Sequence, residues 1–316
     1  MANNQPIDAE SLGGSSVSGM SNETQKSESE SEFSQTSNQQ ESEEGEEDTV
    51  GYGVDSDGFT IREPAYTTQE LVDIILEYYK FLTTIHYNPA DLKIPPPGGW
   101  TNLTPEVLSG YDKSEYVLGL IRQIPCFDRS KGPAGFLYKS GLLDFSVYTS
   151  KDFEEDVDME GIVDFASVEG QANPRHFFRL AEGRESGGHE VWLNAKDGEI
   201  TDFEIRGDGA DPVDIRTYFQ GLKEKYQKLD LFPGEGSVTH DFSDIPESED
   251  AITEEQFLAQ GPEVDTFDNV QFGRNLYRKF GWPENFQREA CWKEVSRLQA
   301  FMGDMEDTDI WEGSPL

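Results

Sequence analysis

Few of the potentially reactive side chains are spaced as they are in known catalytic or metal-binding motifs. The histidines are His86, His176, His189 and His240, and no two lie four residues apart as in the zinc-binding H-E-x-x-H helix. Neither cysteine belongs to a C-x-x-C pair, so a zinc site would have to be assembled from distant residues. The sequence therefore predicts no metal and no cofactor.

Two of the histidines, His176 and His189, flank a predicted β-hairpin and could approach each other. Ordinary histidines at a strand edge are the favoured interpretation, and the pair is kept with Trp192 as a candidate interaction surface. Trp192 alternates with Val191 and Leu193, so its side chain lies on the opposite face of the strand from theirs. If that face meets solvent, it is an exposed binding surface. Packing of Trp192 against a helix in the core is the favoured alternative.

Cys126, Cys291 and one acidic segment are further candidates. Cys126 follows a proline at a helix end and Cys291 lies on an apolar helix stripe, so buried, inert thiols are favoured over activated nucleophiles. Residues 156–161 begin like a calcium-binding loop, but its twelfth position is Ser167 instead of a bidentate Glu. A solvated acidic turn is therefore favoured there.

Signatures of the common enzyme classes are missing from the sequence. It contains no G-x-S-x-G elbow, P-loop, dinucleotide-binding motif or kinase motif. Because 63 of the 316 residues are Asp or Glu, the sequence does not single out any two carboxylates as a general acid and a general base. An enzyme with a dispersed, motif-less site stays open, with His176, His189 and the carboxylates as candidates.

The charge of the chain bears on its partners. Asp and Glu exceed Lys and Arg by 63 to 25, which gives a net charge of −38. Nucleic acid and anionic lipid are bound by clustered Lys and Arg, so neither a nucleic-acid partner nor a membrane is expected. A protein partner with a basic face fits this charge, because complementary charge speeds and selects encounters. An acidic mimic of nucleic acid is a further alternative.

Residues 1–58 are predicted to be a disordered, acidic, Ser/Glu-rich tail. They hold 14 Asp and Glu against one basic residue, Lys26, and offer too little apolar surface to offset chain entropy. Ser27 and Ser29 each have a Glu three residues downstream, as acidophilic casein-type kinases favour, and are candidate phosphorylation sites. Chance matches of this kind are the favoured interpretation in a Ser/Glu tract.

The compartment follows from what the sequence lacks. No apolar run approaches the roughly 20 residues of a membrane span, and the N-terminus has no basic and apolar parts of a signal peptide. Two cysteines cannot build a disulfide framework. The sequence predicts a cytoplasmic or nuclear protein that is neither secreted nor transmembrane.

Residues 59–233 are predicted to form an α+β core, in which a central antiparallel sheet is covered by helices. Thr67 and Glu70 form a capping box before an amphipathic helix over 68–86. Further helices are predicted from Thr104, over 114–124, and from Asp211 to before Pro233. Strands are predicted at 136–138, 142–148, 161–168, 176–180, 190–195 and 199–205, with Asp197-Gly198 turning the last pair into a hairpin.

Residues 234–316, the last quarter of the chain, are predicted to be less regular. Residues 234–265 form an acidic linker with a short helix near Thr253. Residues 266–304 form a pair of helices, the second from about residue 284 to Met302, and residues 305–316 form a tail. Two such helices bury too little surface alone, so we expect them to dock on the core.

Two resemblances accompany these predictions. The region from Glu70 to Met302 resembles a group of uncharacterised filamentous-fungal proteins, through Tyr79 to Leu82, Pro96 to Trp100, Ser140 to Asp144, and Gly281 to Phe286. That resemblance implies no activity. Residues 189–230 are predicted to form a strand, a Gly turn, a second strand and a helix, and they are similar to the last third of the SUKH superfamily. That superfamily includes Smi/Knr-type regulators of fungal cell-wall signalling and bacterial toxin-immunity proteins. This second resemblance implies a non-catalytic α+β module that binds other proteins, and it carries over no functional residue.

Taken together, the sequence predicts a non-catalytic protein-interaction or regulatory protein. The prediction depends on the missing catalytic signatures, the acidic tail and the SUKH-like hairpin and helix.

Overall fold

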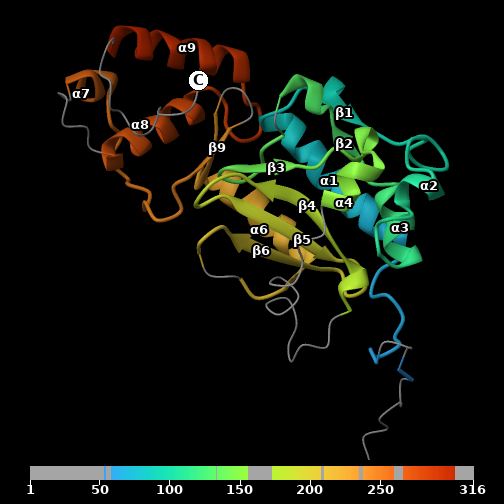
Figure 1. Ribbon diagram of the computed structural model, residues 1–316. Coiled ribbons are helices and arrows are strands. Elements are labelled where there is room, and N and C mark those ends of the chain that lie inside the picture. Colours follow the sequence, from blue (N-terminus) through green and yellow to red (C-terminus); the bar gives the residue numbers. More distant parts are fainter. Residues whose placement is uncertain are drawn as a thin grey trace, which may run out of the picture. The chain divides into compact units, whose positions relative to one another are not determined.

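The computed structural model describes residues 53–54, 58–132, 134–155, 173–207, 210–234, 238–259 and 266–302. Its helices and antiparallel sheets confirm the predicted α+β class (Figure 1). Nearly all of the predicted tail 1–58, the predicted strand 161–168 and the tail 305–316 lie outside the described residues. The predicted division into domains stays a prediction.

Helix α1 (Thr68–Ile85) begins where its capping signals predict. The Thr67 backbone N–H donates to Glu70 Oε2 at 2.8 Å, and the Glu70 N–H donates back to Thr67 Oγ1 at 3.3 Å. Two amide groups that have no partner inside the helix are satisfied in this way. The apolar side chains at helical spacing are buried, namely Leu71, Val72, Ile74, Ile75, Tyr78, Tyr79, Leu82 and Ile85.

The central sheet has the strand order β3-β4-β5-β6-β7, and its neighbouring strands are antiparallel. The strands are β3 (Ser140–Leu142), β4 (Phe177–Gly183), β5 (His189–Asn194), β6 (Glu199–Glu204) and β7 (Val213–Asp214). The predicted hairpin is confirmed, because Asn194 pairs with Glu199 and His189 pairs with Glu204 across the β5–β6 turn. Side chains therefore alternate between two faces of this sheet.

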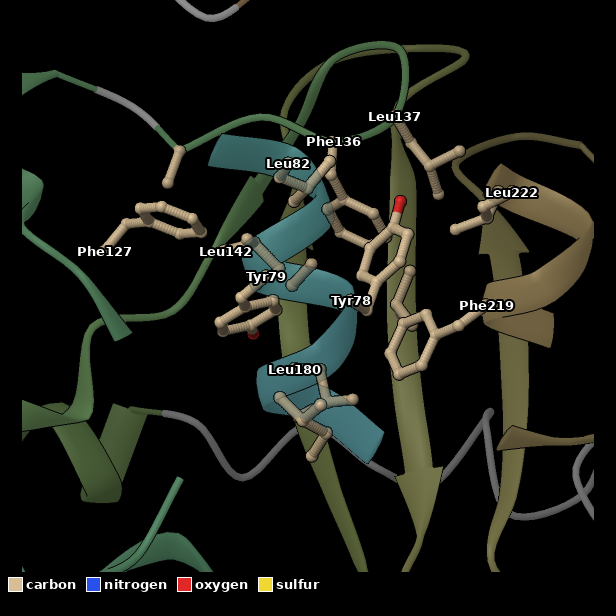
Figure 2. Close-up of a cluster of buried hydrophobic side chains, with 14 of the residues drawn as sticks. Tyr78, Tyr79, Leu82, Phe127, Phe136, Leu137, Leu142, Leu180, Phe219 and Leu222 are labelled. Carbon is tan, nitrogen blue, oxygen red and sulfur yellow. The ribbon is translucent and has the colours of Figure 1, made fainter. Parts of the chain in front are cut away.

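Helices α1 and α6 (Ile215–Lys228) cover one face of the sheet (Figure 2). Tyr78 of α1 stacks on Phe219 of α6, with ring centroids 4.4 Å apart and planes 10° apart. The predicted helix from Asp211 starts later than expected, because residues 213–214 pair with β6 as strand β7. Asp214 then caps α6, accepting from the backbone N–H of Arg216 at 3.0 Å and of Thr217 at 3.3 Å.

Short elements and the C-terminal helices complete the described fold. The helices are α2 (Pro105–Leu108), α3 (Glu115–Ile121), α4 (Ser150–Glu155), α7 (Glu254–Ala259), α8 (Thr266–Lys279) and α9 (Arg288–Met302). Single 3₁₀ turns are η1 (Pro89–Asp91), η2 (Arg129–Lys131), η3 (Phe145–Val147) and η5 (Pro174–His176). Two antiparallel pairs, β1 (Leu92–Lys93) with β2 (Cys126–Phe127) and β8 (Leu231–Pro233) with β9 (Thr239–Asp241), were not predicted.

Two strand predictions before the central sheet are wrong. Residues 136–138 form a turn, and of the predicted strand 142–148 only Leu142 belongs to a strand. The reason is that apolar side chains are also buried from irregular backbone: Phe136 is 1% exposed and Phe145, in η3, is 1% exposed. An apolar run indicates that a segment is buried. It does not by itself distinguish a strand from a packed turn, and the length of the run is the further criterion.

Helix α8 packs on the same hydrophobic core as the sheet and α6. The Tyr277 ring lies 4.3 Å from that of Phe232 between centroids, and the Tyr277 hydroxyl donates to the Pro233 carbonyl. The indole N–H of Trp282, just after α8, donates to the Tyr226 carbonyl at 3.1 Å. These contacts tie the C-terminal helices to the end of α6.

The described part of the predicted linker 234–265 is also packed. Its strand β9 pairs with β8, and its helix α7 places Phe257 against Phe272 of α8 with ring centroids 4.2 Å apart. The predicted short helix at Thr253 is present, and the Thr253 hydroxyl accepts from the Gln256 N–H at 3.2 Å. Acidic composition therefore coexists here with buried aromatic side chains.

Gly198 in the β5–β6 turn should not tolerate a side chain. Its φ is +70°, and a Cβ there would lie 2.2 Å from Cδ2 of Tyr66. We expect Gly198→Ala to lower the free energy of unfolding by about 1–3 kcal/mol, measured by urea denaturation. Gly221→Ala in α6 is the matched control, because a Cβ there meets nothing within 4 Å. This substitution should raise the free energy of unfolding by about 0.5–1 kcal/mol. Equal effects of the two substitutions would contradict this account.

Candidate functional site

His176 has a structural role at the start of β4. It ends the turn η5, and its Nδ1 lies 3.0 Å from the Ser114 hydroxyl, which caps helix α3. The backbone carbonyl of Arg175 also accepts from the Ser114 N–H at 2.8 Å. These bonds attach the start of α3 to the edge of the sheet.

His189 lies at the other end of β5 from His176. The strand register places Phe177 opposite Asn194, and the Ala195 N–H donates to the His176 carbonyl at 2.9 Å. Because β5 runs from residue 189 to residue 194, the two histidines are separated by the length of the strand. The predicted approach of His176 and His189 is therefore wrong, because the antiparallel register of β4 and β5 places the two histidines at opposite ends of the strand pair.

His189 takes part in a polar network with Asp202 and Tyr218. Its Nδ1 lies 2.7 Å from Asp202 Oδ1, and Asp202 Oδ2 accepts from the Tyr218 hydroxyl at 2.8 Å. Burial is the largest single influence on His189 and acts to lower its pKa. The hydrogen bond to Asp202 and the charges of Asp202, Glu204 and Asp241 together outweigh burial, and the net effect raises the pKa.

Trp192 is buried, with 2% of its surface exposed. Its neighbours Val191 and Leu193 belong to the core under α1 and α6, so Trp192 lies on the opposite face of the sheet. Its partners across the strands are Arg179 and Thr201, and the Arg179 guanidinium lies 5.8 Å from the centre of the Trp192 rings. Trp192 therefore offers no exposed ring to a partner.

The remaining candidates from the sequence are inert or lie outside the described residues. Cys126 and Cys291 are fully buried, and burial raises the pKa of each thiol to about 12. Neither is a thiolate at neutral pH, which agrees with the favoured prediction. The serines Ser27 and Ser29 and the acidic segment 156–161 lie in parts of the chain that the structure does not describe.

A buried polar network lies at the end of α1. His86 Nε2 is 2.9 Å from the Thr239 hydroxyl and 3.3 Å from the Tyr226 hydroxyl, and Tyr226 donates to the Phe136 carbonyl at 2.8 Å. Burial, with the nearby charge of Arg288 and with His240, lowers the pKa of His86 to about 3, so the ring is neutral. The Nδ1 atom of His86 is buried and has no hydrogen-bond partner among the described residues.

His86 also lines a cavity of about 220 Å³. Its floor is formed by buried side chains of His86, Tyr87, Phe127 and Ala134. Asp91, Asp128, Arg288 and Trp292 are half-buried and form the walls, and Asn88, Lys131, Gly132 and Glu289 form the exposed rim. Both signs of charge and several aromatic rings therefore meet in one small space.

Three separate segments build this cavity. The end of α1 with η1 supplies the lining residues from His86 to Asp91. The segment of β2 and η2 supplies Phe127, Asp128, Lys131, Gly132 and Ala134, and the first turn of α9 supplies Arg288, Glu289 and Trp292. The Arg288 guanidinium fixes α9 to α1 by donating to the Tyr87 carbonyl at 2.9 Å, and it lies 5.5 Å from the centre of the Trp292 rings. The sequence does not reveal this site, because no single segment carries a recognisable motif.

The described residues and the comparisons add three further findings. Within the described ranges, no group of His, Cys, Asp and Glu side chains is arranged to hold a metal ion. No helix in those ranges combines the length and the apolar character that a bilayer crossing requires. Comparison with models of protein families, with curated proteins and with solved structures gave no match.

Proposed function

We propose that this chain is a non-catalytic protein-interaction or regulatory protein, and that its partner is a protein with a basic face. The observation that carries the proposal is the state of three of its reactive side chains, the two cysteines and His86. Burial raises the pKa of Cys126 and Cys291 to about 12 and lowers the pKa of His86 to about 3. A thiolate nucleophile or a general base needs a pKa near the working pH, and these three groups do not have one.

The charge of the chain supports a basic partner. Its net charge is −38, and the described segment around α7 alone exposes Glu249, Asp250, Glu254 and Glu255. A large negative field attracts and orients positively charged proteins, and this effect weakens as salt screens it. Binding should therefore be fast at low salt and should weaken as the ionic strength increases.

The resemblance to the SUKH superfamily supports the same function. Its elements are a hairpin with a Gly turn followed by an amphipathic helix, and the structure has β5, Gly198, β6 and α6 in that order. Proteins of that superfamily bind other proteins without catalysis. A SUKH-like role in the cytoplasm or nucleus is part of the proposal.

The test is capture followed by direct binding. The full chain and a chain that lacks residues 1–58 serve as bait in a low-salt and a high-salt lysate, and each captured protein is then titrated calorimetrically in purified form. We expect one basic partner that binds with fixed stoichiometry, and whose affinity falls as salt rises. A partner bound equally by both baits would place the contact in residues 59–316. Turnover of a substrate by the purified chain, without such a partner, would overturn the proposal.

A further inference from the structure

We propose that the cavity between α1, β2 and α9 binds a small zwitterion of the α-amino-acid class. Asp91 and Asp128 would receive its ammonium group, and Arg288 would receive its carboxylate. This inference is independent of the protein partner proposed above, because it concerns a small molecule in a cavity.

The walls of the cavity carry opposite charges that do not pair with each other. Asp91 and Asp128 come from the side of η1 and β2, and Arg288 comes from α9. In the described part of the chain, Arg288 forms no ion pair with either carboxylate, and Asp91 forms no side-chain hydrogen bond. Charges left apart across a half-buried space are stabilised by a ligand that carries the complementary charge at each end.

Each wall has unused capacity for hydrogen bonds. Asp128 accepts from the Ser130 N–H at 3.1 Å through Oδ1 and also interacts with the Ser130 hydroxyl, while a carboxylate can accept about four hydrogen bonds in all. Arg288 donates through Nη1 to the Tyr87 carbonyl, and a guanidinium has five N–H groups in all. A carboxylate bound by two of the remaining N–H groups would have the geometry in which Arg is strongest.

His86 is a buried part of the cavity lining. Its ring is 4% exposed, lines the cavity, and has an Nδ1 atom with no partner among the described residues. Tyr226 gives its proton to the Phe136 carbonyl, so the Thr239 hydroxyl donates to Tyr226 at 2.9 Å and accepts from His86 Nε2 at 2.9 Å. In the neutral ring Nδ1 is then the unprotonated acceptor, and a buried polar atom without a partner is costly.

The size and composition of the cavity narrow the ligand class. Its volume of about 220 Å³ is below the roughly 300–1,000 Å³ of pockets for drug-sized molecules, so a nucleotide is too large. A divalent metal does not fit the arrangement of its acidic side chains. The rings of Phe127 and Trp292 offer apolar contact for a short side chain.

The test uses calorimetric titration of the full chain with the twenty free amino acids. For the tightest binder, two analogues are compared with the parent: the N-acetyl form, which lacks the ammonium, and the methyl ester, which lacks the carboxylate. We expect saturable binding of the parent, and about tenfold or greater loss of affinity for each analogue, because one charge-assisted contact is removed in each case.

Matched variants assign each end of the ligand to a wall. Asp91→Asn should weaken the parent and the methyl ester but leave the N-acetyl form unchanged, and Arg288→Gln should show the reverse. Glu284→Gln, at an exposed carboxylate before α9 that does not line the cavity, is the control and should change little. Near-ultraviolet circular dichroism checks that each variant is folded. The proposal is overturned if no amino acid binds at millimolar concentration, if both analogues bind as tightly as the parent, or if Asp91→Asn has no effect.

Discussion

Replacing Arg274 with methionine is expected to lower the free energy of unfolding by about 3 kcal/mol. The Arg274 side chain is 1% exposed, and its Nε donates to the Leu229 carbonyl at 3.2 Å while its Nη2 donates to the Ile245 carbonyl at 3.0 Å. Methionine keeps a long apolar stem but provides no donor, so these carbonyls lose their partner. Urea denaturation of the variant and the parent chain measures the difference.

A local measurement distinguishes this mechanism from a general loss of packing. Arg274 also reaches the Phe242 carbonyl at 3.4 Å and Asp230 Oδ1 at 3.4 Å, so it holds the segment after β9 against the end of α6. Hydrogen exchange at the Phe242 amide, which donates to the Asp230 carbonyl at 2.7 Å, should accelerate in the variant.

Arg278→Met is the matched control for Arg274→Met. Arg278 lies one turn further along α8, is 37% exposed, and pairs with Glu247 at the surface. A surface ion pair contributes under about 1 kcal/mol, so this variant should be nearly as stable as the parent chain. If Arg278→Met costs as much as Arg274→Met, the carbonyl contacts of Arg274 are not what stabilises this region.

Local patterns explain which parts of the fold could be predicted. The capping box of Thr67 and Glu70 and the turn at Gly198 are decided within a few residues, because the cap and the positive φ are properties of short segments. Helix α1 and the β5–β6 hairpin therefore follow from the sequence. The β8–β9 pair was missed, because each strand is three residues long and shows no alternation.

The cavity and the role of Arg274 could not be predicted, because neither is a local property. Arg274 stands between Val270 and Tyr277 on the stripe of α8 that the sequence marks as apolar. Its burial is stable only because the carbonyls of Leu229 and Ile245 accept hydrogen bonds from its guanidinium. These carbonyls lie outside α8, so the sequence of that helix does not reveal them. The wall charges of the cavity likewise come from three distant segments, which meet only after α9 packs beside the end of α1.

His86 is expected to make the fold less stable in mild acid. Its pKa is about 3 in the folded chain and 6.5 in the unfolded chain. Between these values the unfolded state binds a proton that the folded state does not, so the free energy of unfolding falls as the pH falls. Going from pH 7 to pH 5, this one group should remove about 2 kcal/mol of stability. His240, whose pKa is also lowered by burial, acts in the same direction.

The measurement is the difference in the free energy of unfolding between pH 7 and pH 5, from urea denaturation of the parent and of His86→Gln. The variant should lose about 2 kcal/mol less than the parent over this interval, whatever its stability at pH 7. Comparing the two pH values within each variant separates the titration of His86 from the loss of its bond to Thr239.

His189 provides a control of opposite sign. Its folded pKa is raised, so its contribution is fully present below its unfolded pKa and is lost as the pH rises through the folded pKa. His189→Gln should therefore make the loss of stability between pH 7 and pH 5 larger, where His86→Gln makes it smaller. The two histidines titrate in the same unfolded chain and differ only in what surrounds them after folding. If both variants shift the pH dependence in the same direction, burial of a neutral His86 is not what makes the protein sensitive to acid.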